Sequence, residues 1–491
     1  MKCTAWIYAC AIAGGMFANN AMAQGLRQPL SVRPTAFDYN HYLQDDIASP
    51  SDAVAEVVEG NADEATSSIV EESVGEGSHG VTAAHTDSAA PVYHQAAPMA
   101  SAPVDSSCQT CGPTYAAPAC SSCGCNTGCG CGSLGLDLGG LVGDCCLGDA
   151  WTLKSQVLSE CSPLNIGGWF AMGYATDAND MFLDVPDRIN VTQAWMFLEK
   201  LADPTCGNID WGFRADFMYG VDADDTQAFG NDPGEWDFQN GFDHGVYGWA
   251  IPQLYGELAG DGWSVKAGHF YTLVGYEVVT APDNFFYSHA MTMFNSEPFT
   301  HTGVIGSYSV SDNLEVYAGW TLGWDTGFDQ FNDGSSFLGG FSATLSDDVT
   351  FTYISTAGNF GWRGDDGYSH SMVLDTQLTD NVNYVLQSDL VRVDATGEDN
   401  VGINQYFLYS VNDCLGLGTR LEWWKGDSLT GYAPHGGALP ATGSHSYYAA
   451  TFGANIRPDA NLIFRPEVRY DWSPALGYEE TIFAVDAILT F

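Results

Sequence analysis

The segment from 274 to 298 contains the three residues of this sequence that most resemble catalytic machinery. Asp283, Ser288 and His289 are the residue types that a serine hydrolase uses as orienting acid, nucleophile and general base. Three such residues often share a loop by chance, and neighbours on an extended chain point in opposite directions. The sequence also contains no phosphate-binding glycine loop, nucleotide fingerprint or zinc-protease motif. We therefore expect neither enzyme activity nor a cofactor.

The same segment suggests a different kind of chemistry, the selection of solutes at a narrow point. It is rich in aromatic and apolar residues, and its only residues that are charged at pH 7 are Glu277, Asp283 and Glu297. A loop surrounded by water would not be this apolar, because exposing such surface to water costs free energy. We therefore expect the segment to pack against an inner wall or a neighbouring subunit, with its three acids at a constriction.

Five basic residues could face those acids across a passage, because they fall on the polar faces of predicted strands. They are Arg214, Lys266, Arg420, Arg465 and Arg469. Acids that face bases would create a transverse electric field that orients dipolar solutes, by the same logic as charged rings in selective pores. The alternative for each base is a salt bridge to a cross-strand acid such as Asp216, Glu422 or Glu467.

Alternating β-strands must position these residues. In 209–219 the odd positions are apolar or aromatic while the even positions include Asp210, Arg214 and Asp216, and 464–472 alternates in the same way. A soluble sandwich also alternates, but here aromatic residues gather near strand ends and the polar faces carry both signs of charge, which favours a membrane barrel. The expected strands are 166–176, 190–202, 208–220, 248–259, 263–273, 299–310, 314–323, 335–346, 349–359, 368–379, 382–393, 401–412, 417–426, 445–457, 462–473 and 478–491.

The turns between these strands repeat regularly. Short polar turns at Asp312, Asp347, Asp380 and Asp413 follow one another at steps of 35, 33 and 33 residues, the length of a two-strand unit. Longer, glycine-rich acidic loops lie between them, so short turns occupy one rim and long loops the other. The sequence thus predicts an all-β fold, a transmembrane antiparallel β-barrel of about 16 strands. A closed barrel of this size encloses an aqueous channel, so we expect passive diffusion of small hydrophilic solutes.

Three regions precede the predicted barrel, which covers 163–491. Residues 1–23 have the pattern of a signal peptide: Lys2, an apolar stretch and an Ala-x-Ala site that ends at Ala23. Residues 24–107 are acidic and poor in aromatic residues, so we expect a disordered linker. Residues 108–162 form a segment rich in cysteine and glycine. Export followed by barrel insertion predicts the outer membrane as the location and its lipid as the surroundings.

Nine of the 14 cysteines lie in the Cys/Gly-rich segment: Cys108, Cys111, Cys120, Cys123, Cys125, Cys129, Cys131, Cys145 and Cys146. Disulfides persist in oxidising compartments, so we expect cross-links within or between chains. Metal binding is the alternative, although the two C-x-x-C pairs are closer together than in a zinc ribbon. If the cysteines cross-link the chain to the cell envelope, the barrel would anchor a structural or adhesion protein. This is the alternative to a channel.

The charge balance limits the partners of the chain. It has 61 acidic and only 15 basic residues, a formal net charge of -46. Such a chain cannot neutralise a phosphate backbone, which excludes nucleic acid as a partner. An acidic mouth concentrates cations, so we expect mild cation selectivity. The alternative is that the charge only keeps the outer surface solvated, because salt screens charges over about 8 Å.

Several stretches resemble the OmpL-like β-barrel porins of the porin-2 group, which are found in planctomycetes and some proteobacteria. These stretches are 252–258, 265–272, 274–277, 284–288 and 299–303. The last strand, which ends at Phe491, is similar to the signal that the outer-membrane assembly machinery recognises, and the Cys-rich segment resembles those that precede planctomycete barrels. The resemblance implies a porin in the outer membrane whose third outer loop, here 274–298, narrows the barrel. By analogy with 16-strand porins it also implies a homotrimer.

Overall fold

The computed structural model describes residues 145, 147–159, 162–204, 209–363, 366–394, 397–426 and 444–491. Its strands are β1 (Leu164–Ala175), β2 (Asn190–Lys200), β3 (Asp210–Gly220), β4 (Gly248–Ala250), β5 (Leu254–Gly260), β6 (Trp263–Tyr271), β7 (Thr300–Ser311), β8 (Leu314–Thr321), β9 (Ser335–Ser346), β10 (Val349–Asn359), β11 (Gly367–Thr379), β12 (Val382–Val393), β13 (Glu398–Asn412), β14 (Leu415–Gly426), β15 (His445–Asp459), β16 (Leu462–Ser473) and β17 (Tyr478–Thr490). Its helices are α3 (Leu153–Val157), α4 (Ala223–Thr226), η2 (Ala281–Asp283), α5 (Met291–Ser296) and η3 (Gly361–Arg363). In the described part of the chain, every helix is too short or too polar to cross a membrane.

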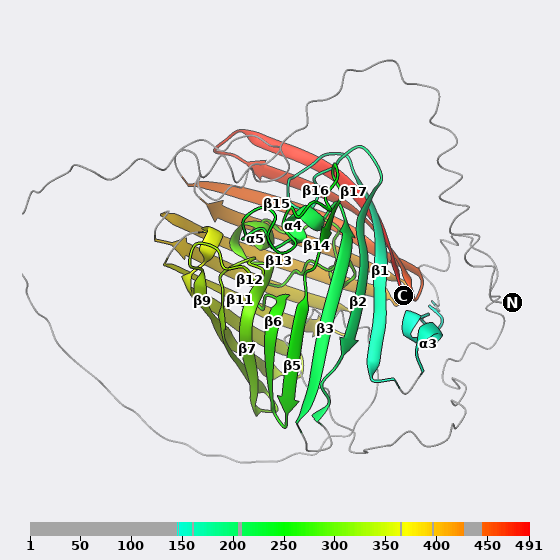
Figure 1. The fold of residues 1–491 in the computed structure, drawn as a ribbon. Coiled ribbons are helices and arrows are strands. Elements are labelled where there is room, and N and C mark those ends of the chain that lie inside the picture. The colour runs from blue at the N-terminus through cyan, green and yellow to red at the C-terminus, as the bar shows by residue number, and fades with distance from the viewer. Residues whose placement is uncertain are drawn as a thin grey trace, which may run out of the picture. The chain divides into compact units, whose positions relative to one another are not determined.

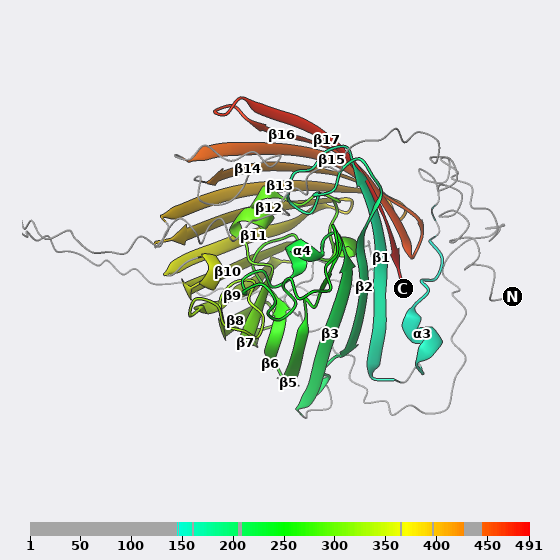
Figure 2. The same ribbon diagram turned by 45° about the horizontal axis from the view of Figure 1, so that its top comes forward.

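The strands form one closed antiparallel barrel. Each strand pairs with its neighbours in chain order, and the last strand, β17, pairs with β1, from Trp169 opposite Thr490 to Ala175 opposite Ala484. Figures 1 and 2 show β1 in cyan beside β17 in red, where the sheet closes on itself. Closure leaves no unpaired sheet edge, which a barrel within a membrane requires.

Two short strands share one position in the wall. β4 and β5 both pair with β3, β4 with 218–220 and β5 with 210–215. The chain between them contains Pro252, which has no N–H to donate to a ladder. The Gln253 carbonyl still accepts a hydrogen bond from the Asp216 N–H at 2.9 Å. The 17 labelled strands therefore fill sixteen positions, which confirms the predicted number.

The predicted strand boundaries agree with the structure to within a few residues. β9, β10, β12 and β16 begin and end at the predicted residues, and the tight turns predicted at Asp312, Asp347, Asp380 and Asp413 join consecutive strands. β13 begins three residues earlier than predicted because its ladder with β12 continues as far as Val393 opposite Glu398. The alternation of apolar and polar residues in the sequence was therefore enough to predict most of the strand boundaries.

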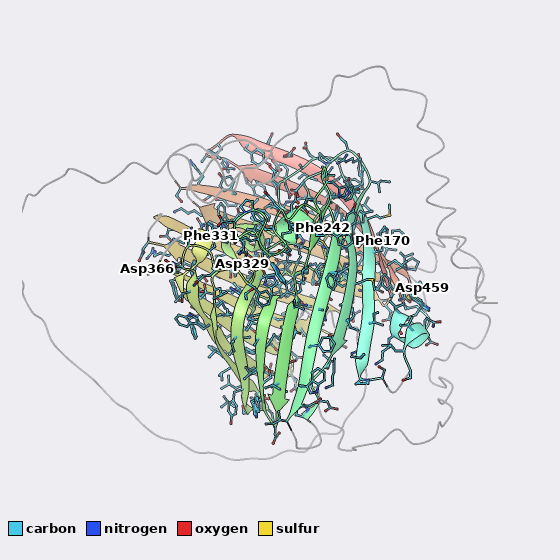
Figure 3. All side chains as sticks on the ribbon, viewed as in Figure 1. Phe170, Phe242, Asp329, Phe331, Asp366 and Asp459 are labelled. Atoms are coloured by element: carbon cyan, nitrogen blue, oxygen red, sulfur yellow. A yellow bond between two sulfur atoms is a disulfide. The ribbon has the colours of Figure 1, made fainter. Side chains whose placement is uncertain are left out.

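Opposite faces of each strand meet opposite environments. On β3, Asp216 and Met218 are fully buried, while Trp211 and Phe217 on the other face are 55% and 50% exposed. Phe170 of β1, labelled in Figure 3, is a further exposed apolar side chain. An apolar outer face and a polar inner face are the reverse of a soluble protein and match a wall that faces lipid.

Candidate functional site

A long segment between β6 and β7 folds into the barrel. Residues 274–298, called here the inner loop, contain η2 and α5, and most of their side chains are buried, with Phe286 3% and Met291 0% exposed. The loop is hydrogen-bonded to Arg420 of β14, which lies eight of the sixteen wall positions away from β6. The inner loop therefore crosses the interior to the opposite wall. Its apolar composition predicted this packing.

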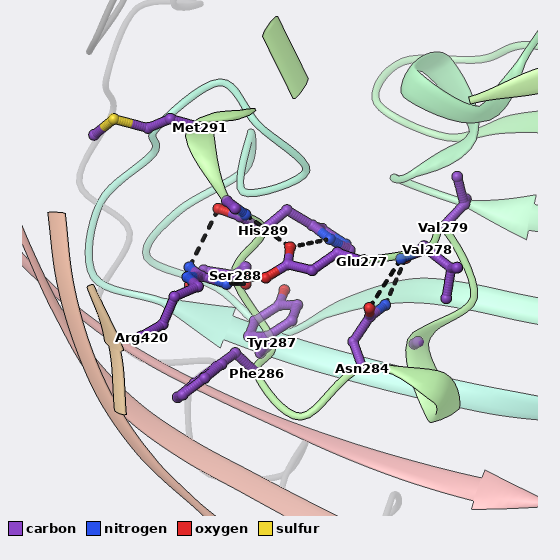
Figure 4. A network of polar contacts seen from close by, with 12 residues as sticks. Glu277, Val278, Val279, Asn284, Phe286, Tyr287, Ser288, His289, Met291 and Arg420 are labelled. Atoms are coloured by element: carbon purple, nitrogen blue, oxygen red, sulfur yellow. Dashed lines mark hydrogen bonds and ion pairs between the residues drawn. The ribbon is translucent and has the colours of Figure 1, made fainter. Parts of the chain in front are cut away.

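Arg420 is the centre of the contacts between the inner loop and the wall (Figure 4). Its Nη1 donates to Glu277 Oε1 and to the Ser288 carbonyl, both at 2.7 Å. Its Nη2 donates to Ser288 Oγ at 3.0 Å and to the His289 carbonyl at 3.2 Å. Its Nε donates to Glu422 Oε1 at 2.7 Å, and the side chain is 0% exposed. The planar guanidinium thus binds two carboxylates and the loop backbone at once.

Glu277 receives hydrogen bonds from several directions. Besides Arg420, it accepts from the Ala290 N–H at 2.8 Å and from Tyr406 Oη at 3.1 Å, and His289 Nδ1 lies 3.2 Å away. Burial alone would raise the pKa of Glu277, but the charge of Arg420 and the bonds from His289 and Ala290 outweigh it and lower the pKa to about 2. The carboxylate is therefore held in its charged form.

A second arginine holds the first half of the inner loop. Arg465 Nη1 donates to three loop carbonyls, those of Ala281 and Asn284 at 2.7 Å and that of Phe286 at 2.9 Å. Its Nη2 donates to Asp486 Oδ2 of β17 at 2.6 Å. The arginine thus satisfies backbone acceptors that would otherwise be buried without partners.

Two wall carboxylates accept hydrogen bonds from the loop backbone. Glu467 accepts from the N–H groups of Tyr287 at 2.9 Å and Ser288 at 3.1 Å. Glu422 accepts from the Met291 N–H at 2.7 Å. The wall therefore supplies both donors and acceptors to the loop, and the loop has one defined position on it.

The three arginines of β14 and β16 lie beneath the inner loop. Arg469 donates to the His289 carbonyl and to Asp471 at 2.8 Å each, and, like Arg420, its side chain is 0% exposed, while that of Arg465 is 3% exposed. The sequence left a salt bridge to a wall acid as the alternative for each base, and here Arg420 and Arg469 both pair with Glu422. Arg420 touches Glu277 directly, because the loop packs onto the wall instead of standing away from it.

Arg214 and Lys266 lie on the other half of the wall. Arg214 forms ion pairs with Glu199 at 3.0 Å and Asp216 at 2.7 Å, and its side chain is 21% exposed. Lys266 Nζ lies 4.3 Å from the centre of the Tyr255 ring and sits opposite Glu257 in the ladder of β5 and β6. Four of these side chains are called here the charged belt: Glu199, Arg214, Glu257 and Lys266.

The remaining two acids of the loop have different surroundings: Glu297 is buried, whereas Asp283 is exposed. Asp283 accepts a hydrogen bond from Thr280 Oγ1 at 2.6 Å. Glu297 accepts from Gln387 Nε2 at 2.5 Å, and the same nitrogen donates to Asp389. Burial, followed by the nearby charge of Asp389, raises the pKa of Glu297 well above its usual range. Of the two buried acids of the loop, Glu277 therefore has a lowered pKa because its partner is Arg420, whereas Glu297 has a raised pKa because its neighbour is another carboxylate.

The three residues with hydrolase chemistry have separate partners. Ser288 Oγ accepts from Arg420, His289 contacts Glu277, and Asp283 binds Thr280. In this arrangement they hold the loop to the wall and to itself. Among the described residues, no group of three or more His, Cys, Asp or Glu side chains could hold a metal ion.

Some wall residues that bind the loop had no distinct signal in the sequence. Gln193 of β2 donates to the Val279 carbonyl at 2.8 Å and accepts from the Ala281 N–H at 3.0 Å. Gln387, which donates to Glu297, is a further example. Their only sequence signal is a polar residue on the inner face of an alternating strand, and many other residues share that property.

The part of the chain that forms the wall and the inner loop matches a known protein family in sequence. Residues 163–491 match the family described as "Putative beta-barrel porin-2, OmpL-like". The chain belongs to this family. Its OmpL-like porin domain therefore coincides with the predicted barrel, and the protein is an outer-membrane porin by family.

Solved structures that resemble this OmpL-like porin are outer-membrane proteins of low identity. The outer membrane channel DcaP of Acinetobacter baumannii is 12% identical, with a TM-score of 0.45, over 67% of this chain and 97% of that one. The Salmonella typhi OmpF complex with daunomycin is 13% identical, with a TM-score of 0.46, over 67% and 97%. An anion-selective porin from Comamonas acidovorans is 9% identical, with a TM-score of 0.45, over 67% and 99%. Comparison with curated proteins gives no match.

Of the nine cysteines expected to form cross-links in this OmpL-like porin, Cys145 is the one that lies within the described residues. Cys145 forms a disulfide with Cys414, in the turn between β13 and β14. Cys414 was not among the cross-link candidates, because a partner 269 residues away has no sequence signal. The other candidates lie outside the described residues: Cys108, Cys111, Cys120, Cys123, Cys125, Cys129, Cys131 and Cys146.

Proposed function

We propose that this porin allows small hydrophilic solutes to diffuse passively across the outer membrane, with a mild preference for cations. The observation that carries the proposal is the closed wall of sixteen strand positions with polar side chains inside and apolar side chains outside. A barrel of that size has room for a water-filled passage. The inner loop narrows the interior, and its contacts with Arg420, Arg465 and Arg469 hold it against one part of the wall.

The passage runs along the charged belt on β2, β3, β5 and β6. Arg214 and Glu199 are 21% and 14% exposed, so they reach water, whereas the arginines under the inner loop do not. The two acids and two bases of the belt lie side by side, with the buried Asp216 as a further partner of Arg214, and opposite charges this close together create a strong local field. Such a field orients dipolar solutes as they pass.

The cation preference follows from the charges that remain after internal pairing. The region 163–491 contains 44 acidic and 11 basic residues. Three of these bases are buried against carboxylates and carbonyls, so they attract no anions from solution. Exposed acids lie in the long loops, for example Asp329 and Asp366 (Figure 3). Their negative potential raises the local cation concentration within the screening distance of roughly 8 Å.

Single-channel conductance of the full-length protein in a planar bilayer under a potassium chloride gradient tests this proposal. Stable open steps with a reversal potential of cation sign are expected. A reversal potential of anion sign would overturn the selectivity but keep the channel. A folded, heat-modifiable barrel that passes no current would overturn the channel and favour the structural or adhesion alternative, in which the N-terminal cysteines cross-link to the envelope.

We also propose how the protein reaches and occupies the membrane. Residues 1–23 direct export, and the assembly machinery recognises the last strand that ends at Phe491. By analogy with 16-strand porins the protein is a homotrimer. Chemical cross-linking in native outer membranes, followed by mass measurement, distinguishes trimers from monomers.

A further inference from the structure

A short segment crosses one rim of the barrel. Cys145 and residues 147–159, called here the rim strap, precede β1 and contain α3. The strap begins at the disulfide between Cys145 and Cys414, in the turn of β13 and β14. Two residues later, the Leu147 carbonyl accepts a hydrogen bond from the Ala460 N–H at 3.1 Å, in the turn of β15 and β16. The strap therefore connects two neighbouring short turns.

Asn461 holds the next part of the strap. The Trp151 N–H donates to Asn461 Oδ1 at 2.6 Å, and Asn461 Nδ2 donates to the Trp151 carbonyl at 2.7 Å. The same Nδ2 donates to the carbonyl of Thr490 on β17 at 2.9 Å. One side chain thus binds the strap and the last strand together, and it is only 8% exposed.

The strap continues across the pairing of the first and last strands. The Trp151 ring lies 6.4 Å from the ring of Phe491, just after β17. Lys154 Nζ then donates to Asn165 Oδ1 of β1 at 2.7 Å. The pairing of β1 with β17 closes the barrel and joins the two ends of the wall, so its formation carries the largest loop-closure entropy. The strap therefore touches β1 and the residue that directly follows β17.

We propose that the rim strap is a redox-dependent clamp on the closed barrel and that the Cys145–Cys414 disulfide locks it. The short-turn rim of an outer-membrane barrel faces the periplasm, where disulfides form and persist. A thiol–disulfide oxidoreductase supplies the oxidant. The thiolate of one cysteine attacks the disulfide of the oxidoreductase, the other thiolate then displaces the enzyme, and the enzyme leaves as a dithiol that carries two electrons and two protons. The clamp depends on the outer-membrane location but not on conduction.

The test compares the unfolding rate of the full-length protein in detergent with and without a thiol reductant. Reduction of the folded wild-type protein should increase the unfolding rate about tenfold, because the strap can then leave the rim before β1 separates from β17 and its chain is no longer restricted by the cross-link. Cys414→Ser should unfold at the rate of the reduced wild type and should not respond to reductant. If reduction accelerates Cys414→Ser as much as the wild type, or has no effect on the wild type, the clamp is refuted.

A pair of asparagine variants tests the noncovalent part of the clamp. Asn461→Ala should unfold faster than Asn381→Ala under oxidising conditions. Asn381 is the matched control, because its Nδ2 donates to the Ser410 carbonyl at 3.0 Å in another short turn. Equal rates for the two variants would refute a role for Asn461.

Peptide mapping without reductant should recover the Cys145–Cys414 link, and a different partner for Cys414 would overturn the proposal even if the barrel conducts.

Discussion

Replacement of Glu277 by glutamine tests the anchoring of the inner loop. When the loop is bound, the pKa of Glu277 is about 2, whereas in a released, hydrated loop it returns to the ordinary value of 4.5. A difference of this size corresponds to about 3 kcal/mol that favours the bound loop when Glu277 is charged. Because the bound pKa is lowered, this stabilisation is complete above pH 4.5 and is lost as the pH falls toward 2.

Hydrogen exchange of the loop amides measures this free energy. At pH 7, Glu277→Gln should increase the exchange of the amides between 286 and 292, corrected for intrinsic rates, by about two orders of magnitude. The difference between variant and wild type should shrink as the pH falls through 4.5. Glu479→Gln is the matched control, because Glu479 is exposed on β17 and accepts a bond from Tyr470 at 2.9 Å. Unchanged exchange in Glu277→Gln, or an increase that does not depend on pH, would refute the reasoning.

Three other substitutions test separate features of the barrel. Gly275→Ala should loosen the inner loop, because φ is +92° there and a Cβ would collide with the Glu297 carboxylate; proteolysis within the loop should become faster than in Gly477→Ala, where φ is +64° and no atom lies within 4 Å. Lys266→Gln should move the reversal potential toward the cation value, because the belt loses a base; an unchanged potential would remove Lys266 from the passage. Phe217→Arg should lower the free energy of unfolding by about 2–4 kcal/mol, because a charge would face lipid; equilibrium unfolding beside Phe217→Leu checks this, and equal stability would place Phe217 outside the membrane.

The sequence predicted the wall well because each strand alternates and each tight turn carries its own polar residues. The sequence analysis predicted one continuous strand over 248–259 and missed its interruption between β4 and β5, although Pro252 cannot donate a hydrogen bond to a continuous ladder. The apolar character of the inner loop predicted that it packs inside. Its partners were not predictable, because Arg465 binds three backbone carbonyls and carbonyls have no sequence signal. The same limit applies to Cys414, whose partner depends on the path of the closed chain.

The path of the inner loop has a mechanical consequence for the barrel. The loop leaves and rejoins the wall at adjacent strands, β6 and β7, and its middle is fixed by Arg420 on β14, halfway around the circumference. A hollow cylinder flattens easily when pressure on it is uneven, because its wall can bend without stretching. A strut across the diameter resists that flattening. We therefore expect the inner loop to brace the cross-section of the barrel against lateral pressure from the surrounding lipid.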